Sequence, residues 1–474
     1  MHRDHMDRRD FLKAGAGALT LAGCRTATAP GETAGRPNVL FVVSDQQHYQ
    51  ALGAVDPFFD TPHLDALAAE STLFTRAFCT TPQCSASRSS MYTGYYPHRT
   101  TVVGNIGSVR HTGEKVAGLP PGFPTAGRIL GDAGYHTGYF GKWHLGRAEH
   151  FAAQFDESRL NGNAHGGATR RAIAYLEARA AAPGQPFALC VNYINPHDIY
   201  HFKKLATQGE LGPPEEAAPL PPSWAEDFSG KPAPQQRFMT HDQGEYMVGR
   251  PERYWRHYRL FYRDKCRLVD RQVGELLTAL RRLGLAENTV VVYVSDHGDM
   301  DTQHRCIYKG PFMYEHMVRV PLLMRLPARW GGVVGRRTDE MVSGVDILPT
   351  LCALTGASPP ADEPGRSLLS LLTGEGRFNS REYVVSEYYN KQKWVNPIRM
   401  IRTGRYKYNL YRVHGEELYD LEDDPHELVN RAADPGCAAV KRELAAELRD
   451  WRAARGDTEF DRLMPTRRDG APLS

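Results

Sequence analysis

The sequence predicts an α/β fold in which helices flank a large parallel sheet and a small α+β subdomain follows at the C-terminal end. Residues 38–44, 187–193 and 289–295 are continuous apolar runs, typical of strands buried on both faces of a parallel sheet. Residues 320–324 indicate a further strand. Helical segments alternate with these runs, whereas short alternating strands dominate from about residue 376 onward.

Two helices are predicted between the strands. Thr61 and Pro62 offer an N-cap and a first-turn proline to a helix over residues 63–70, directly after the first strand. Residues 254–283 carry leucine and valine at helical spacing. This apolar stripe indicates packing against the core, not a cofactor site.

The C-terminal subdomain is predicted to contain three short strands and a terminal helix. The strands are expected at 383–387, 398–402 and 405–411, and the helix at 438–455. Prolines cluster among polar residues between 211 and 238. We therefore expect a surface insertion without a regular element there, placed to line the substrate cleft.

The composition is that of an ordinary globular protein. Of the 474 residues, 41% are hydrophobic and 24% charged, which excludes a disordered or membrane-embedded chain, and the net charge of +3 is too small to indicate nucleic acid as a partner. The eight cysteines follow no metal-ligand or disulfide-framework spacing. Most of them are predicted to be buried thiols.

The first residues are predicted to be an export signal. Arg8 and Arg9 precede a weakly apolar stretch in the pattern of a twin-arginine signal, too short to span a membrane as a helix. The stretch ends in LAGC, a lipobox-like sequence that predicts cleavage before Cys24 and lipid attachment to its thiol. A plain cleaved signal is the alternative. The expected location is the periplasm or outer membrane, with contact to the membrane through the lipid alone.

The domain boundaries follow from these patterns. We expect a signal and tether over residues 1–36, a catalytic domain over 37–375, and the C-terminal subdomain and tail over 376–474.

Polar side chains follow three of the predicted strands. Asp45 and Gln46 end the first, residues 195–198 read Asn-Pro-His-Asp after the second, and residues 296–299 read Asp-His-Gly-Asp after the third. Ligands of an open α/β sheet bind beyond the carboxyl ends of its strands, so these groups are expected to converge on one hard divalent cation. Each aspartate alone could instead cap a turn.

The segment from Thr81 to Gly94 carries the most specific motif. It reads TPQCSASRSSMYTG, with Cys84 followed by Ser, Ala, Ser and Arg88. Together with NVLFVVSDQQ, GYHTGYFGKWHLG, VSDHGD and YKGPFMYE, in that order, it resembles the sulfatase family over nearly the whole mature chain. The resemblance implies an alkaline-phosphatase-like sandwich with a large mixed, mostly parallel sheet.

The resemblance also implies a modified nucleophile and a metal ion. Cys84 would be oxidised to formylglycine (3-oxoalanine), whose hydrated aldehyde offers one oxygen to attack sulfur and a second to expel sulfate. The implied ion is Ca²⁺, because its ligands are mainly oxygen. By family position, the ligands would be Asp45, Gln46, residue 84, Asp296 and His297.

Five further residues are implied to act on the sulfate ester. Arg88 would support the diol and the sulfate, Lys142 and His144 would bind the sulfate and the oxygen of residue 84, and His197 and Lys309 would serve the leaving oxygen. Hydrolysis of a sulfate ester requires fixed positive charge that holds the sulfate oxygens and a proton for the departing oxygen. Taken singly, each is an ordinary polar or solvated residue. His98, Arg99 and His304 are expected only to lie in or near the cleft.

Two departures from the family pattern bear on maturation and on the pocket. Ala86 stands where proline is preferred by the oxygen-dependent maturase, which favours a radical-type, cytoplasmic formylglycine-generating maturase as the partner. The block after Asp296 lacks the commoner Gly-x-His-Gly, so the role of His304 is not carried over.

The predicted function is hydrolysis of sulfate monoesters, on carbohydrate or aryl substrates. A phosphomonoester or phosphonate hydrolase on the same fold is one alternative, because phosphate and sulfate share a tetrahedral geometry. A lipoprotein that binds sulfated glycans without hydrolysing them is another, and would follow if Cys84 escaped oxidation.

Overall fold

The computed structural model describes residues 35–108, 113–161 and 167–467. The described residues from Arg36 onward belong to one compact unit. The predicted export signal and the lipobox at Cys24 lie outside the described residues.

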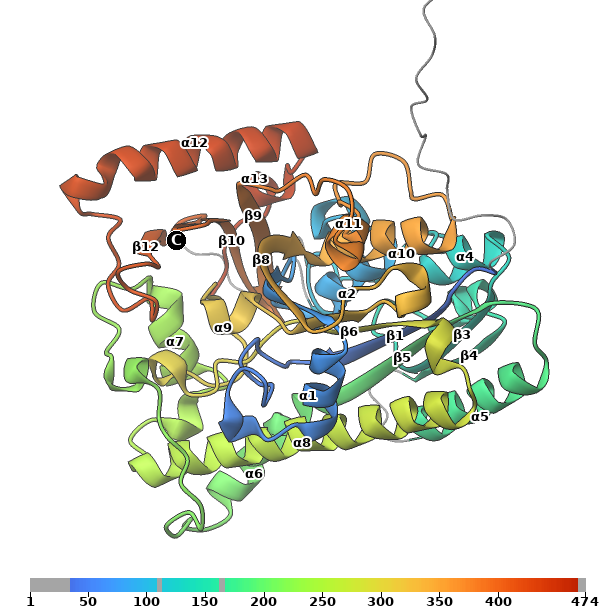
Figure 1. Cartoon of the computed structure of the whole chain (residues 1–474). Helices are drawn as coiled ribbons and strands as arrows, with labels where there is room; N and C mark the ends of the chain where they lie inside the picture. Colours follow the sequence, from blue (N-terminus) through green and yellow to red (C-terminus); the bar gives the residue numbers. More distant parts are fainter. Residues whose placement is uncertain (1–34, 109–112, 162–166, 468–474) are drawn as a thin grey trace, which may run out of the picture. The chain divides into compact units, whose positions relative to one another are not determined.

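The core of this unit is a mixed sheet of eight strands in the order β4-β3-β5-β1-β6-β7-β2-β8 (Figure 1). β7 runs antiparallel to both of its neighbours, and the other pairs are parallel. The large, mostly parallel sheet is therefore confirmed. The strands are β1 (Asn38–Asp45), β2 (Thr72–Phe78), β3 (His136–Lys142), β4 (Glu157–Asn161), β5 (Phe187–Pro196), β6 (Thr289–Ser295), β7 (Leu322–Arg325) and β8 (Arg336–Ser343).

Helices cover both faces of this sheet, as Figure 1 shows. On one face, α1, α5 and α8 pack against Leu40 and Val42 of β1. On the other, α2, α4 and α10 pack against Phe41 and Val43. Side chains alternate along a strand, so a strand covered on both faces must be apolar throughout, which explains its continuous apolar run. The helices are α1 (Pro62–Ala69), α2 (Cys84–Thr93), α3 (Pro97–Thr100), α4 (Ala126–Asp132), α5 (Ala168–Ala181), α6 (Phe202–Thr207), α7 (Ala233–His241), α8 (Glu252–Arg282), α9 (Glu315–Val318), α10 (Ile347–Thr355), α11 (Leu369–Thr373), α12 (Ala438–Arg455) and α13 (Glu459–Arg462).

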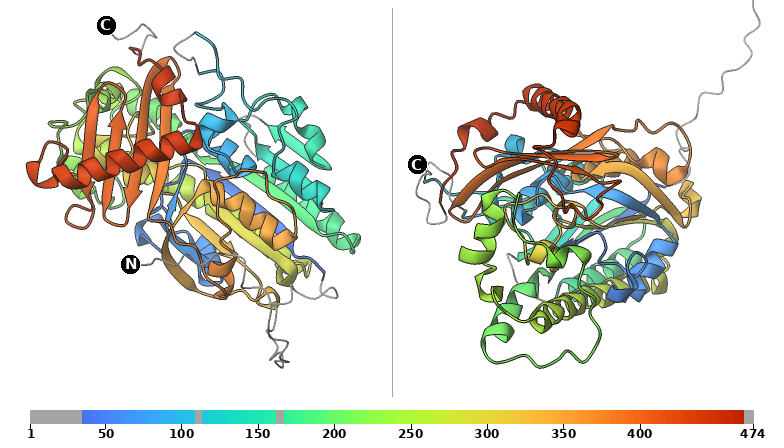
Figure 2. Two further views of the ribbon diagram at one scale, coloured as in Figure 1. Left: turned by 90° about the horizontal axis from the view of Figure 1, so that it is seen from above. Right: turned by 90° about the vertical axis from the view of Figure 1, so that its left-hand side faces the viewer.

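The C-terminal part adds an antiparallel sheet in the order β12-β11-β10-β9, crossed by α12 (Figure 2). Leu444, Leu448 and Trp451 of α12 pack on apolar side chains of this sheet such as Ile401 and Tyr408. The strands are β9 (Tyr383–Lys391), β10 (Trp394–Thr403), β11 (Tyr406–Tyr411) and β12 (Gly415–Asp420). The predicted α+β composition of this region is confirmed, and α12 has the predicted bounds.

Two local expectations are wrong. Segment 211–238 contains a short 3-10 helix and the start of α7, because Phe238 packs on Phe312 and the buried Gln235 donates a hydrogen bond to Glu417 Oε1 at 2.7 Å. Thr61 stands at the N-cap position of α1 without capping it. Its hydroxyl instead accepts from the Gly53 backbone N–H at 2.8 Å.

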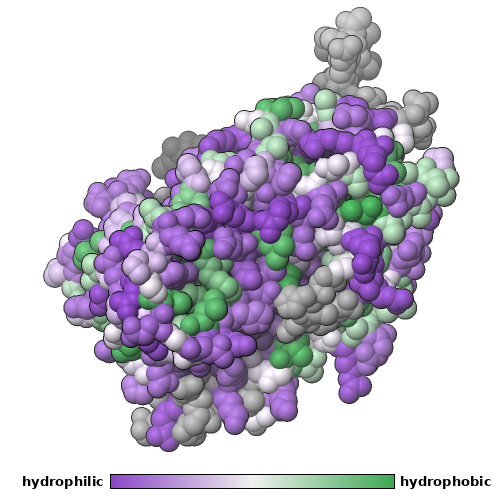
Figure 3. All heavy atoms as spheres, turned by 90° about the horizontal axis from the view of Figure 1, so that it is seen from below, coloured by the Kyte–Doolittle hydropathy of each residue, from purple (hydrophilic) through white to green (hydrophobic). Residues whose placement is uncertain are grey.

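The surface and the cysteines agree with the composition. Figure 3, which views one face, shows hydrophilic side chains interspersed with small hydrophobic ones. No helix among the described residues has the length and apolar character needed to cross a bilayer. Of the seven described cysteines, all free thiols, six are buried and Cys437 is partly exposed.

Gly141 lies where β3 meets the active-site loops, and a side chain does not fit there. Its φ is +114°, and a Cβ would lie 2.0 Å from the carbonyl oxygen of Asn192 in β5. Gly131 in α4 offers a contrast, since a Cβ there meets only a methyl group at 3.9 Å.

We predict that Gly141→Ala destabilises the protein by about 2 kcal/mol or more, because it adds backbone strain and a clash. Gly131→Ala should be neutral or stabilising by up to about 1 kcal/mol, because alanine favours a helix. The measurement is the apparent melting temperature of both variants. Equal melting temperatures would contradict the steric account of Gly141.

Candidate active site

The strand ends bring the polar residues to one edge of the sheet. β1 and β6 pair in parallel with Ser44 opposite Ser295, so Asp45 and Asp296 emerge side by side. Lys142 ends β3, His197 follows β5, and Cys84 is the first residue of α2. Five separate segments of the chain thus meet at one point.

Four of the residues predicted to bind metal form a tight buried cluster. Each of Asp45, Cys84, Asp296 and His297 offers one ligand atom, and these atoms lie within 4.8 Å of one another. Cys84 Sγ is 3.2 Å from His297 Nε2 and 3.6 Å from Asp45 Oδ1. All four side chains are fully shielded from solvent.

Gln46 is positioned by its neighbours so that its side-chain oxygen faces this cluster. Its φ of 72° turns the backbone N–H toward Asp296 Oδ1 at 3.1 Å, and its Nε2 donates to Asp299 Oδ2 at 2.7 Å. Gln46 Oε1 then accepts from Lys309 Nζ at 3.0 Å. Asp299, which was expected to converge on the cation with the rest of the Asp-His-Gly-Asp block, is outside the cluster and holds the Gln46 amide instead.

Arg88 bridges the two carboxylates. It donates from Nε to Asp296 Oδ2 at 2.8 Å and from a terminal nitrogen to Asp45 Oδ2 at 3.3 Å. The other terminal nitrogen donates to Asn192 Oδ1 at 2.9 Å. Asn192 was missed, although a polar side chain inside the apolar run of β5 was a signal for it.

Burial and neighbouring charges shift the pKa values of the two carboxylates in opposite directions. Burial opposes ionisation of Asp45, but Lys142, His197 and Arg88 hold its pKa below the usual range despite the added charge of Cys84. Burial and the charge of Asp45 raise the pKa of Asp296 to about 7. The Lys142 ammonium is hydrogen-bonded to Asp45 Oδ2.

Lys309 reaches the cluster from the loop before α9. Its Nζ donates to Cys84 Sγ at 2.8 Å and lies 3.0 Å from His297 Nε2. Burial disfavours the Cys84 thiolate, but Lys142 and Lys309 outweigh it and place the pKa of the thiol well below its ordinary value. Residue 84 is therefore held in a strongly electropositive setting.

His144 and His197 flank the same side chain. Both imidazoles interact with Cys84, and both are partly exposed. Burial, reinforced by Lys142, lowers the pKa of His197 to about 4, and burial also lowers that of His144. Both rings are consequently neutral at pH 7 when the site holds no anion.

A cavity of about 640 Å³ opens above these residues. His144, His197 and Lys309 line it, and segment 211–238 contributes none of its lining residues, so the expectation that this segment lines the cleft is wrong. The other lining residues are Asn105, Ile106, Gly107, Ser108, Lys115, Tyr200, Asp242, Gln243, Lys391, Gln392 and Lys393.

Three residues that were expected in or near the cleft, His98, Arg99 and His304, do not line it. His98 Nδ1 is 2.5 Å from Glu387 Oε1, Arg99 lies over the Tyr95 ring, and His304 stacks on Tyr314 at 3.7 Å. None of the three lines the 640 Å³ cavity. Their side chains contact Glu387, Tyr95 and Tyr314 instead.

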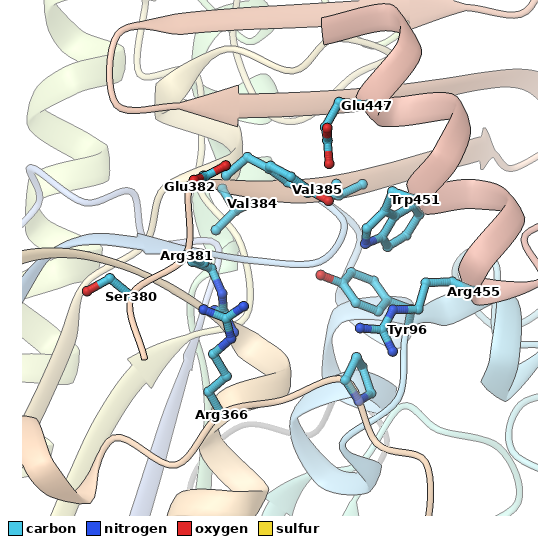
Figure 4. A pocket seen from close by; sticks show the side chains of 12 residues that line it. Tyr96, Arg366, Ser380, Arg381, Glu382, Val384, Val385, Glu447, Trp451 and Arg455 are labelled. Atoms are coloured by element: carbon cyan, nitrogen blue, oxygen red, sulfur yellow. The ribbon is translucent and has the colours of Figure 1, made fainter. Parts of the chain in front are cut away.

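A second cavity of about 390 Å³ lies beside α12, as Figure 4 shows. Tyr96, Trp451, Arg366 and Arg381 point into it, and Arg381 is bound to the Asp346 carboxylate at 2.7 Å. No residue predicted to be catalytic lines this cavity. The chemistry implied by the sequence belongs to the 640 Å³ cavity.

The arrangement is suited to a reaction at a tetrahedral anion. The small, buried side chain of Cys84 belongs to a carboxylate cluster able to hold a cation and contacts His144, His197 and Lys309, which line the cleft. Fixed positive charge in a site shielded from water stabilises negative charge that develops on substrate oxygens.

Comparisons with known proteins agree with this geometry. The Sulfatase family model matches residues 37–357, and a model described as N-sulphoglucosamine sulphohydrolase, C-terminal, matches residues 303–454. A Delta 4,5-hexuronate-2-O-sulfatase of Bacteroides thetaiotaomicron is 32% identical over 458 residues, which cover 91% of this chain and 92% of that protein.

Two solved structures extend the comparison. The structure of a 2-O GAG sulfatase superposes with a TM-score of 0.81 at 30% identity, covering 91% of this chain and 95% of the other. The phosphonate monoester hydrolase of Agrobacterium radiobacter gives 0.67 at 22% identity, over 89% and 96%. The second likeness establishes a shared fold and nothing finer.

Proposed function

The chain belongs to the sulfatase family and is a sulfuric ester hydrolase, and from that premise we propose that it cleaves sulfate monoesters with an oxidised Cys84 beside a bound calcium ion. The observation that carries the proposal is the position of Cys84. It is the first residue of α2, lies in the carboxylate cluster, and contacts Lys309, which lines the cleft.

Residue 84 is proposed to act as formylglycine, and its surroundings suit an oxygen at this position. The Cys84 Sγ stands where the oxidised residue would carry its oxygen, within reach of Lys309, His144 and His197. When formed, the hydrated aldehyde supplies a nucleophilic oxygen and a second hydroxyl that allows sulfate to be released. A radical-type maturase is the proposed source of the oxidation, because Ala86 follows two residues after Cys84.

The donor set fits calcium. Asp45, Asp296 and Gln46 offer oxygen, the ligand type that this ion prefers, and His297 and residue 84 complete the set. Lys309 Nζ contacts Gln46, Cys84 and His297, so these atoms readily accept a positive group. When bound, the ion supplies positive charge next to residue 84 and the substrate oxygens.

The remaining groups bind the sulfate and serve the leaving oxygen. Lys142 and Arg88, both buried, are proposed to hold residue 84 and the sulfate in place. Lys309 donates hydrogen bonds at the mouth of the site, whereas His197 is neutral at pH 7 and accepts or relays a proton. We therefore assign donation of a proton to the leaving oxygen to Lys309, and acceptance or relay of a proton to His197.

Sulfated carbohydrates are the proposed substrates. The support is the 32% identity to a hexuronate-2-O-sulfatase and the size of the cleft, which is that of a pocket for a sugar-sized ligand. A phosphonate monoester hydrolase shares the fold, so turnover of 4-nitrophenyl sulfate should be compared with that of 4-nitrophenyl phosphate. Faster turnover of the phosphate would favour that alternative.

We predict that Cys84→Ala and Cys84→Ser are folded but inactive on sulfate esters. Alanine has no nucleophile, and an unmodified serine has one hydroxyl and no second one with which to release sulfate. The loss of stability should stay at about 1 kcal/mol or less, because the side chain is small. The matched control is Cys352→Ala, a buried cysteine in α10.

Turnover and melting temperature are measured for the wild type and all three variants produced with a maturase, and Cys84→Ser is also produced in a host without one, with mass spectrometry to confirm an unmodified serine. Repeated turnover by unmodified Cys84→Ser would refute the formylglycine mechanism.

Metal removal tests the calcium site. Chelation should abolish turnover, and added Ca²⁺ should restore it. Asp45→Asn and Asp296→Asn should each lose bound metal, because each removes a charged oxygen ligand. Asp198→Asn, a buried carboxylate after another strand that lies outside the cluster, should retain it. Calcium is quantified by atomic absorption, and wild-type metal content in both site variants would place the ion elsewhere.

Export and lipid attachment at Cys24 are proposed from the twin arginine and the LAGC sequence. Radioactive fatty acid should label the wild-type protein in cells, and Cys24→Ala should abolish the label. Cys437→Ala, which removes a partly exposed cysteine, should keep it. Label that persists in Cys24→Ala would disprove the anchor.

A further inference from the structure

The cleft holds more positive charge than one sulfate ester requires. Four lysines line it, Lys115, Lys309, Lys391 and Lys393, whereas Asp242 is the one carboxylate among its described lining residues. Lys309 already belongs to the nucleophile cluster. The other three need a separate explanation.

Two of these lysines come from the C-terminal sheet. Lys391 ends β9, Trp394 begins β10, and the two-residue turn between them contains Lys393. Lys391 is 7% exposed, and its ammonium donates to the carbonyl oxygen of Lys309, which ties the turn to the catalytic loop. Lys391 is thus engaged in holding the turn over the cleft.

Lys393 and Lys115 remain available to a ligand. Both are exposed, and within the described parts of the chain neither ammonium forms an ion pair. The backbone at Lys393 is anchored, since its carbonyl oxygen accepts from Thr466 Oγ1 at 2.9 Å and Trp394 beside it is buried. Lys393 therefore lines the cleft from a fixed turn.

The cleft also offers neutral polar groups. Asn105, Ser108, Gln243 and Gln392 line it together with the lysines. Such groups bind hydroxyls, whereas unpaired ammonium groups bind anions. The combination describes a ligand that carries both hydroxyls and negative charge.

We propose that Lys393 and Lys115 bind a second anionic group of the substrate, a carboxylate or an additional sulfate, on the sugar that carries the scissile sulfate or on its neighbour. The proposal rests on the proposed function and narrows its substrate class to multiply charged glycans. Singly sulfated neutral sugars would then bind weakly, although the reaction at residue 84 is the same.

Binding measurements in the Cys84→Ala background separate this subsite from catalysis. The variants are Lys393→Met, Lys115→Met and the double variant, with Lys204→Met as a control for an exposed lysine of α6 outside the cleft. The ligands form two pairs, an unsaturated hexuronic acid 2-O-sulfate with its methyl ester, and glucosamine 2-N,6-O-disulfate with N-acetylglucosamine 6-O-sulfate. Calorimetry gives each Kd.

The double variant should weaken binding of the doubly charged member of at least one pair by about tenfold or more, and change the singly charged member less than about twofold. The pair that responds identifies the second anion as carboxylate or sulfate. Lys204→Met should leave every Kd unchanged.

An equal loss for both members of each pair, or no loss in either, would overturn the subsite. So would a failure of the doubly charged ligands to bind more tightly than the singly charged ones before any lysine is changed. Hydrolysis of 4-nitrophenyl sulfate by the otherwise wild-type Lys393→Met protein tests the proposed function independently, because this substrate has no second anion.

Discussion

The site depends on keeping two buried carboxylates together. Asp45 and Asp296 leave adjacent strands with oxygens within 4.8 Å, where their repulsion is about 3 kcal/mol at an effective dielectric constant of about 20, besides the cost of burying each charge. Arg88 bridges them from α2, and Lys142 contacts one of them from β3. The cations that neutralise this pair therefore tie α2 and β3 to the ends of β1 and β6 around residue 84.

The C-terminal sheet is tied to the same site, because β9 contacts the segment before α2 and its last residue, Lys391, lines the cleft. The Glu387 backbone N–H donates at 2.7 Å to the carbonyl oxygen of Thr80, which lies four residues before Cys84. The Ser386 hydroxyl donates to the carbonyl oxygen of Cys79. Gly104 approaches β9 so closely that a Cβ would lie 2.0 Å from Asn390 Oδ1. If Lys393 binds a second anionic group as proposed, differences in the β9–β10 turn alter substrate choice without touching the reacting atoms.

Much of this could be predicted from the sequence, for identifiable physical reasons. β1 and β6 are buried on both faces, so their apolar runs marked them almost to the residue. Strands with mixed faces, such as β2 and β8, gave no such run and were missed. Gln235 shows why segment 211–238 was misjudged, since its amide is satisfied by residues distant in the sequence, Tyr314, Tyr411 and Glu417. Lys391 and Lys393 reach the cleft through the packing of the C-terminal sheet, which no local pattern encodes.

The central claim is that residue 84 is an oxidised cysteine in the active protein. Its most direct test is mass spectrometry of the peptide that contains residue 84, from protein produced with a radical-type maturase and again without one. The account predicts that maturation replaces the sulfur and two hydrogens of Cys84 by one oxygen, and that sulfatase activity rises in proportion to the modified fraction. Full activity in protein whose Cys84 is entirely unmodified would contradict it.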